Sequence, residues 1–532
     1  MVLPFPAELW LDIFHGLAKE GEYDTLERCR VVCRELYPIA KECLSWNMTF
    51  KSTEGVERIK VDTSGEEMRR WGGPATVDIN GSPGGDQPIP HLATFASRLG
   101  GRWTSVKELR ISSAVWRARD LDADTVFRDL ARFPSITQLT LVDVKFPTIL
   151  MLGRLVCALP RLDDVRLYNV RFTRQPFDPS TISQFRLLPR TQLKGLVLGE
   201  SEVAAMPTHS FIELVDVIAA IGNRQCPVPP RGPTQACPVW SAIRALEITS
   251  YSFPSVAALA RLLCALPSLE TLKLHWSRTS LKHGFDRKSI PAHSSLPSRL
   301  EAVEVIFRDI VRPDPRSVAD LVDFFITTGI SNQLRCLDIP PRSSLPTECY
   351  VSFCRLIKHS MQSLHDLSVN ADLFRPTLNG KDMSLHADQT TAPYLSLSEC
   401  TRLKYLALTV DVTLGNGSCL CTPVIEVLSH VTSTQISQIV VNFSANPWLG
   451  LLGEGLKSLM DGLPQLDAVL SLPVFDNLAE VWISVGNIDH RDGEWVTAAL
   501  GACLGACLPK LYERRSVNSL MRHVQDESAS GL

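Results

Sequence analysis

A few short stretches of the chain carry residue types at spacings that could support chemistry. Gly450 and Gly455 are followed by Lys457 and Ser458, which comes close to a phosphate-binding loop. In such a loop the lysine directly follows the second glycine, so that its ammonium group reaches the phosphates. Leu456 separates the two residues in this chain. The sequence therefore does not predict a nucleotide site.

Two cysteine pairs have spacings that a metal ion could use. Cys419 and Cys421 are separated by one residue, and Cys503 and Cys507 by three. A structural zinc ion needs four ligands, and neither pair has a second cysteine or histidine pair close by in the sequence. The 12 histidines form no metal-binding motif, and no nucleophile elbow is present. We expect a protein that is not an enzyme and that uses no metal or other cofactor.

Charge and cysteine content narrow the remaining function classes. The 532 residues carry a formal net charge of −3, which gives no general attraction to nucleic acid or to an anionic membrane. No apolar stretch reaches the roughly 18 residues of a membrane helix, and no signal peptide is recognisable. The 15 cysteines at irregular spacing predict reduced thiols. We expect a cytoplasmic or nuclear protein, or one found in both, without nucleic-acid or membrane partners.

A six-residue pattern with apolar residues at its first, fourth and sixth positions recurs through the body of the chain. Its twelve copies begin at Val106, Ile136, Leu162, Leu193, Ile243, Leu269, Leu300, Leu334, Leu364, Leu403, Ile436 and Leu478. The copies are mostly 26 to 34 residues apart, and most follow a segment of helical periodicity. Each copy ends in the alternation of a short strand. One strand and helix cannot bury their own apolar face, whereas stacked copies can, so the pattern predicts an α/β solenoid.

A constant offset relates two parts of this array. The run 154–162 recurs 107 residues later as the run 261–269, with Cys157 matched by Cys264. Identity of this extent indicates an internal duplication.

The strand pattern resembles that of leucine-rich repeats, in which Leu-x-x-Leu-x-Leu marks each strand. The asparagine that usually follows is mostly missing, although Asn169 stands near that position. The resemblance is therefore to irregular members of the family. It implies a horseshoe-shaped α/β solenoid whose strands line the concave face. An ordinary α/β domain with repeated strand–helix units is the alternative.

The first 46 residues read as a separate apolar module of three short helices. Pro6 suits the first turn of a helix, and Glu8 suits its positive N-terminal end. The module carries more bulky apolar residues than so small a bundle can bury. Such a surface either caps the neighbouring repeat or binds a partner.

The same stretch resembles an F-box. Its residues Phe5-Pro6-Ala7-Glu8-Leu9, Ile13-Phe14, Leu17, Leu26, Cys29 and Val31-Val32-Cys33-Arg34 follow that family's pattern, with Phe5 where leucine is usual. The resemblance implies docking on a Skp-type adaptor and, through it, on a cullin–RING scaffold. The repeats would then hold a target protein for ubiquitination. The residues that would supply or support the adaptor contact are Pro6, Leu9, Ile13, Leu17, Leu26, Cys29, Val32 and Cys33.

Target binding is expected on the strand face of the repeats. The fifth position of each pattern points away from the core because strand residues alternate between faces. The positions selected on this ground are Arg166, Glu247, Lys273, Glu304, Asp338 and Trp482. Trp482 is expected to be exposed, as aromatic residues at interfaces often are.

The expected organisation has four parts. The F-box-like helices occupy 1–46, and 47–105 form a linker that could include an incomplete first repeat with a strand at 76–79. The solenoid spans 106–515, and 516–532 form a polar tail. Two functions remain open: a target-recognition subunit of a ubiquitin ligase, or a protein-interaction scaffold outside that pathway whose N-terminal helices only cap the solenoid.

Overall fold

The computed structural model of the chain describes residues 6–61, 69–81, 88–117, 123–173, 184, 193–199, 214–216, 218, 240, 242–249, 256–277, 299–308, 314–339, 346–374, 396–412, 420–445, 452–486, 505–514 and 517–518. The chain divides into two compact units. The first comprises residues 1–251, 257–270 and 291–299, and the second comprises 252–256, 271–290 and 300–532.

Three helices open the first unit. They are α1 (Ala7–Lys19), α2 (Tyr23–Val32) and α3 (Leu36–Cys43), and they pack on one another. Their shared core contains Phe14, Leu26 and Ala40, all of which are buried. Pro6 precedes the first helical residue and Glu8 lies in the first turn, where a carboxylate is favoured.

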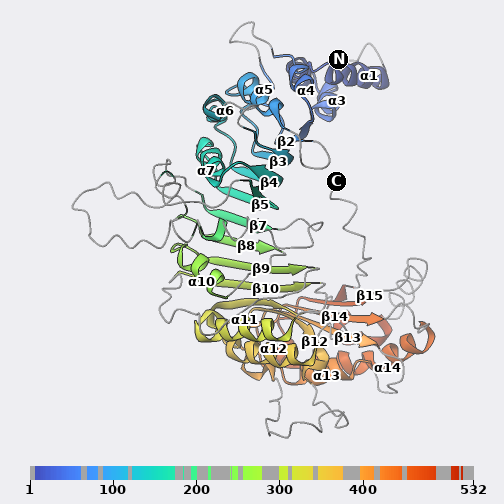
Figure 1. Cartoon of the computed structure of the whole chain (residues 1–532). Helices are drawn as coiled ribbons and strands as arrows, with labels where there is room; N and C mark the ends of the chain where they lie inside the picture. Colours follow the sequence, from blue (N-terminus) through green and yellow to red (C-terminus); the bar gives the residue numbers. More distant parts are fainter. Residues whose placement is uncertain are drawn as a thin grey trace. The chain divides into compact units, whose positions relative to one another are not determined.

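Parallel strands follow in the order of the sequence. They are β1 (Asn47–Phe50), β2 (Thr76–Asn80), β3 (Glu108–Val115), β4 (Gln138–Phe146), β5 (Asp164–Tyr168), β7 (Gly195–Gly199) and β8 (Ala245–Thr249), with the short β6 (Arg171–Phe172) beside β4. The helices of this unit are α4 (Thr53–Glu57), α5 (Pro90–Leu99), α6 (Ala123–Leu130), α7 (Ile149–Ala158) and nearly all of α10 (Val256–Cys264). Figure 1 shows α5, α6 and α7 together along one side of the strands.

The strand array of the first unit begins earlier than the expected solenoid boundary at residue 106. Strand β2 falls on the expected strand at 76–79, and it pairs with β1 on one side and β3 on the other. Val77 and Ile79 lie opposite Leu109 and Ile111, and all four side chains are buried. The stretch 47–105 therefore contributes two full strands to the array and does not act only as a linker.

The second unit repeats this arrangement of parallel strands. They are β9 (Thr271–Ser277), β10 (Ala302–Arg308), β11 (Leu334–Asp338), β12 (Asp366–Asn370), β13 (Tyr405–Val412), β14 (Gln438–Ala445), β15 (Glu480–Gly486) and β16 (Val517–Asn518). Its longer helices are α11 (Pro315–Thr327), α12 (Thr347–Ser360), α13 (Thr422–Ser429) and α14 (Leu452–Leu470), and the short α16 (Pro509–Glu513) packs on α14. Strand β16 falls inside the stretch expected to be a polar tail, and the tail from 519 onward lies outside the described residues.

The twelve strands expected from the six-residue pattern are confirmed, and together with their helices they form an α/β solenoid. They are β3, β4, β5 and β7 to β15. The apolar residues at the first, fourth and sixth positions of all twelve copies are buried. Most neighbouring copies pair fourth position to fourth position, as when Leu139 lies opposite Val165. Stacking therefore buries a face that no single unit could cover.

Residues in the left-handed conformation occur in register on three neighbouring strands of the first unit, within β3 and β4 and directly after β5. Ser113, Asp143 and Asn169 have φ angles of 50°, 54° and 51°, and each stands two residues after its six-residue pattern. The amide nitrogen Nδ2 of Asn169 donates to Asp143 Oδ1, and the backbone N–H of Asn169 donates to the carbonyl of Gly199 at 2.9 Å. Asparagine and aspartate tolerate this conformation because their short side chains can hydrogen-bond locally.

The internal duplication has a counterpart in the helices. The two runs related by the offset lie in α7 and α10 and in the turns that follow them. Arg154 of α7 forms an ion pair with Asp124, and Arg261 of α10 forms one with Asp216 at 3.1 Å. Equivalent positions thus make equivalent contacts with the preceding helical stretch.

Candidate docking surfaces

Helix α1 separates an inward face from an outward apolar face. On the inward face, Phe14 is buried and lies edge-on to Trp10, with ring centres 5.8 Å apart. On the outward face, Leu9 and Ile13 are 48% and 45% exposed. Their spacing of four residues aligns these two side chains along the helix, and Pro6 at the start of the helix is exposed as well.

The end of α2 adds further apolar surface. Val32 is 69% exposed, and Val31 beside it is also exposed. Cys33 ends the helix in an extended conformation with φ of −153°. Cys29, one turn earlier, is half-buried, and burial raises the pKa of its thiol, so that it packs as a neutral group.

The eight candidate adaptor residues fall into three groups. Pro6, Leu9, Ile13 and Val32 are exposed, and Leu17, Cys29 and Cys33 are half-buried. Leu26 is 0% exposed and lies in the core of the three helices, so it supports the surface and cannot touch a partner directly. The sequence left open which of the eight residues face outward and which form the helical core, and the burial of Leu26 puts it in the core.

Two aromatic residues of this region were not selected from the sequence. Tyr37 in α3 and Trp46 just before β1 are both exposed. Arg30 and Lys41 approach the Tyr37 ring at 6.0 and 5.8 Å from its centre, which is cation–π geometry. An aromatic residue flanked by polar residues at the end of the module was the signal that could have identified Trp46.

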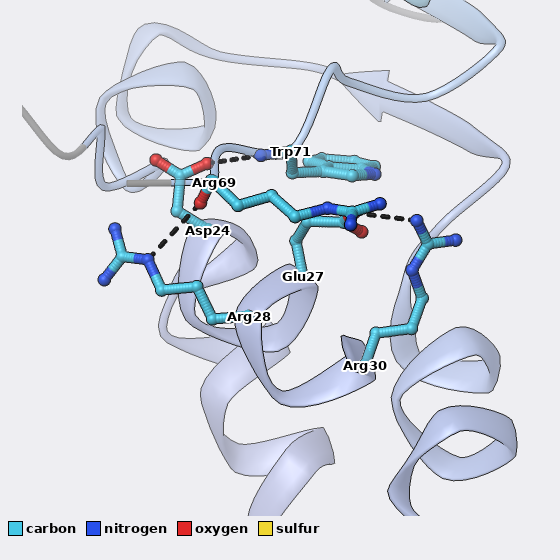
Figure 2. A network of polar contacts seen from close by, with 6 residues as sticks. All are labelled: Asp24, Glu27, Arg28, Arg30, Arg69 and Trp71. Atoms are coloured by element: carbon cyan, nitrogen blue, oxygen red, sulfur yellow. Dashed lines mark hydrogen bonds and ion pairs between the residues drawn. The ribbon is translucent and has the colours of Figure 1, made fainter. Parts of the chain in front are cut away.

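Helix α2 also carries a network of polar contacts with the segment 69–71 (Figure 2). Glu27 is 5% exposed, and its carboxylate accepts from Arg30 at 2.7 Å and from Arg69 at 2.8 Å. Asp24 Oδ1 accepts from the backbone N–H of Trp71 at 2.8 Å. These contacts tie α2 to the chain that enters β2.

An aromatic chain continues from this network into the repeats. Tyr23 of α2 stacks on Trp71 with ring centres 4.7 Å apart, and Trp71 lies edge-on to Trp103 at 5.5 Å. Trp103 in turn contacts Phe95 of α5 at 6.1 Å. Burial raises the pKa of the Tyr23 hydroxyl above its ordinary value. The helices of the module and the core of the first repeats are therefore in continuous contact.

The turn between α1 and α2 rests on the end of α4. Gly21 has a φ angle of 79°, and a Cβ atom at this position would lie 2.2 Å from the carbonyl oxygen of Arg58. The Gly21 carbonyl accepts from the backbone N–H of Lys60 at 3.1 Å. The Lys60 ammonium group lies 3.2 Å from Glu22.

On the strand face of the first unit, Arg166 and Glu247 are both half-buried. They lie on either side of Val197, which is buried between them. Arg166 Nε donates to Asp164 Oδ2 at 3.3 Å. Burial raises the pKa of the Tyr168 hydroxyl, Arg166 acts against this shift, and Glu247 and Asp164 add to it.

On the strand face of the second unit, the expected row of fifth positions is interrupted. Lys273 lies opposite Glu304, and their side chains form an ion pair at 2.8 Å. Glu304 lies opposite Cys336, however, and Asp338 lies opposite Ile306, because the β10–β11 register shifts between Val303 and Glu304. Glu304 and Asp338 were expected at equivalent positions, and this shift corrects that expectation.

The environment of Cys336 is acidic. Burial raises the pKa of its thiol to about 12, and Asp366, Glu304 and Asp338 add to the shift. The thiol therefore stays protonated.

Trp482 is half-buried, whereas the sequence predicts an exposed side chain. Its Nε1 donates to Glu480 Oε2 at 3.0 Å. The short strand β16 places Asn518 beside Trp482, on the side away from β14. A strand that could not be recognised in the sequence therefore flanks this residue.

The remaining candidates yield no assembled site. Gly450, Cys419 and Cys503 lie outside the described residues, while Lys457 and Ser458 lie within α14. Across the described ranges, no group of three or more histidine, cysteine or acidic residues could hold a metal ion. No helix in the same part of the chain is long and apolar enough to cross a membrane.

Comparison with protein-family models and with curated proteins finds no match. Among solved structures, the chain is similar to an internalin from Listeria monocytogenes, at 12% identity and a TM-score of 0.29 over 98% of this chain and 99% of that one. It is also similar to a chain of the Rad7 and Elc1 complex in yeast, at 15% identity and a TM-score of 0.26 over 66% and 82%. The leucine-rich repeat domain of APL1B matches at 12% identity and a TM-score of 0.20 over 66% and 78%.

TM-scores this low carry no argument about function. The parallel strands and the buried repeat pattern define the class of the protein, an α/β solenoid with leucine-rich-repeat-like strands. In this chain the solenoid is preceded by three packed helices that carry exposed apolar residues.

Proposed function

We propose that the chain is the target-recognition subunit of a cullin–RING ubiquitin ligase of the Skp–cullin–F-box type. The observation that carries the proposal is the exposure of Leu9, Ile13 and Val32 on a helical module whose sequence resembles an F-box. The protein performs no chemistry in this role. It raises the effective concentration of target lysines near a charged conjugating enzyme. The 11 described cysteines are free thiols, which suits the cytoplasm or nucleus.

The adaptor contact is centred on the outward face of α1. Covering the exposed halves of Leu9 and Ile13 contributes roughly 1 kcal/mol each. An unpaired carboxylate in a covered apolar site costs more than the lost burial, because it gives up its hydration. Leu9→Asp with Ile13→Asp should therefore lower adaptor affinity at least about 100-fold, equivalent to ~2.7 kcal/mol.

The test is a titration of the full chain with a purified Skp-type adaptor. The matched control is Val351→Asp with Leu472→Asp, two apolar residues of similar exposure in the second unit. The control should bind as the unchanged chain does, and circular dichroism should report both variants folded. Unchanged adaptor binding by the α1 variant would refute the proposal.

A protein-interaction scaffold outside the ubiquitin pathway is the second candidate. The contacts of α2 with 69–71 favour it, since they are what a cap on the first repeat would make. Under this reading the exposed face of α1 has no adaptor. Failure of the unchanged chain to bind any Skp-type adaptor would favour the scaffold, as would unfolding of the whole chain by Leu9→Asp with Ile13→Asp.

Target binding is proposed for the strand face, through Arg166 and Glu247 in the first unit and Lys273, Glu304, Asp338 and Trp482 in the second. All six side chains are partly accessible, which supports the proposal. Glu304→Lys with Asp338→Lys should abolish target capture and leave adaptor binding intact. The first substitution also places a second cation beside Lys273.

The control for charge reversal is Glu348→Lys with Asp461→Lys. Both residues are exposed on helices of the second unit, away from the strands. Proximity labelling in cells with the proteasome inhibited would compare targets captured by the two variants. Equal capture by both would refute the strand-face assignment.

A further inference from the structure

We propose that Glu27 and the segment 69–71 form a joint that fixes the orientation of the docking helices on the first repeats. Glu27 is then a positioning residue: it touches no adaptor, and it determines where the exposed face of α1 points. The consequence for the ligase rests on the proposed function, whereas the joint itself rests on contacts within the first unit.

Arg69 is the link between the two elements. Glu27 Oε1 accepts from Arg30 and from Arg69, and the Glu27 side chain is almost completely covered. A carboxylate removed from water needs such partners, because an unpaired buried charge is strongly unfavourable. Arg30 lies on the same helix as Glu27, so of the two residues that pair with this carboxylate it is Arg69 that joins α2 to another part of the chain.

Three further contacts cross the same junction. Asp24 accepts from the backbone N–H of Trp71, and Arg28 Nε donates to the carbonyl of Arg69 at 3.3 Å. Tyr23 stacks on the Trp71 ring at an interplanar angle of 23°. The α2 residues involved are 23, 24, 27 and 28, which share one side of a helix. Every partner lies within three consecutive residues (Figure 2).

The segment is held at its other end as well. Gly73 has a φ angle of 90°, and a Cβ atom there would lie 2.6 Å from the Trp103 ring. Ala75 and Thr76 donate their backbone N–H groups to the carbonyl of Trp46. The chain from Arg69 to β2 is thus fixed to α2 at its start and to the repeat core at its end.

Directional contacts explain why such a joint resists rotation. An apolar contact alone allows sliding, whereas charge-assisted hydrogen bonds require a particular geometry. Because four α2 residues contact one short segment, α2 can rotate only if several of these bonds break together. Helix α1 packs on α2 and α3 and follows their orientation.

The test measures the orientation in the full chain. Spin labels introduced as unnatural amino acids at Asp12 and Ser97, both exposed in the first unit, report the distance between α1 and α5. The unchanged chain should give a narrow distance distribution. The double variant Glu27→Gln with Arg69→Ala should broaden this distribution. The single variant Arg69→Lys, in which Glu27 is unchanged and keeps a cation beside its carboxylate, should keep the distribution mostly narrow.

Hydrogen exchange supplies an independent measurement. The amide of Trp71 should exchange at least about tenfold faster in Glu27→Gln with Arg69→Ala, because its acceptor on α2 is released by local opening. Amides of β4 and β5 should not change. The matched control is Lys194→Ala, which breaks an exposed ion pair with Asp163 at 3.2 Å in the same unit.

The outcomes separate the joint from the proposed function. A narrow distribution and unchanged Trp71 exchange in the double variant would overturn the joint, as would a broad distribution in the unchanged chain. Adaptor affinity should stay within about threefold in the double variant, since neither Glu27 nor Arg69 is one of the exposed apolar residues proposed to touch the adaptor. A chain that binds no adaptor refutes the proposed function and leaves the distance measurement to decide the joint.

Discussion

Gly21, in the turn between α1 and α2, gives a quantitative test of how the helical module rests on the repeats. Its φ angle of 79° is left-handed, and an added Cβ would lie 2.2 Å from Arg58 O and 2.9 Å from the attached carbonyl carbon. A left-handed conformation costs a non-glycine residue about 1–2 kcal/mol. The contact is with backbone, which cannot rotate away, so the turn must move off α4.

The expected cost of Gly21→Ala combines two contributions. The first is the cost of the left-handed conformation. The second is the loss of the hydrogen bond from Lys60 N–H to Gly21 O, which costs roughly 1 kcal/mol. A total of about 2–3 kcal/mol corresponds to a 30- to 150-fold larger equilibrium constant for local opening. Hydrogen exchange at the Lys60 amide measures that constant, and the amides of β4 should be unaffected.

The matched control is Gly16→Ala. Gly16 lies within α1, and a Cβ atom there would have nothing within 4 Å. Alanine should stabilise the helix by about 0.5–1 kcal/mol, because glycine loses more backbone freedom on folding. If Gly21→Ala left Lys60 exchange within about twofold of the unchanged chain, the described contact between the turn and α4 would be wrong.

Three further predictions concern buried groups. Burial lowers the pKa of His91 below its ordinary value, so the folded chain favours neutral imidazole; stability should be intact above about pH 6.5 and fall as pH drops below it, and His91→Gln should flatten this profile in thermal melts. Asp467 is buried and accepts from the backbone N–H of Leu511 at 3.0 Å; Asp467→Ala should leave that amide unpaired at a cost of about 1–3 kcal/mol, detected as faster proteolysis of 505–514. Phe95→Ala removes a ring that stacks on Phe133, with ring centres 4.9 Å apart. It should lower the free energy of unfolding of the first repeats by about 3–5 kcal/mol, measured by hydrogen exchange of their amides in increasing denaturant. The His91 prediction is wrong if the melting temperature of the unchanged protein does not vary across about pH 5–8. The Asp467 prediction is wrong if Asp467→Ala and the unchanged chain are cut equally fast. The Phe95 prediction is wrong if Phe95→Ala lowers the free energy of unfolding by less than ~1 kcal/mol.

The strands were predictable because their signal is local. In a strand, alternate side chains face the core, so the apolar positions of each six-residue copy predict which residues are buried. Which outward side chains remain accessible was less predictable. Thr140, Val197 and Ala407 occupy the same fifth position as Arg166 and yet are buried. Short side chains are covered by longer neighbours on adjacent strands, which stand about 4.8 Å away.

Contacts between remote residues were not predictable from the sequence. The register shift at Glu304 depends on how β10 meets β11, and no repeat pattern records it. The Glu27–Arg69 ion pair joins residues 42 positions apart. Glu27 reads as an ordinary surface residue of an amphipathic helix, because its partner belongs to a segment without a recognisable motif.

The sequence by itself determined the helices of the N-terminal module, the repeated strands and the faces that those strands bury, since periodicity acts over a few residues. Only the tertiary structure decided which apolar residues of the module stay accessible. Leu26 and Val32 are both apolar residues of α2, but one is buried and the other exposed. Burial depends on neighbours supplied by other parts of the chain, and hydrophobic character alone does not specify those neighbours.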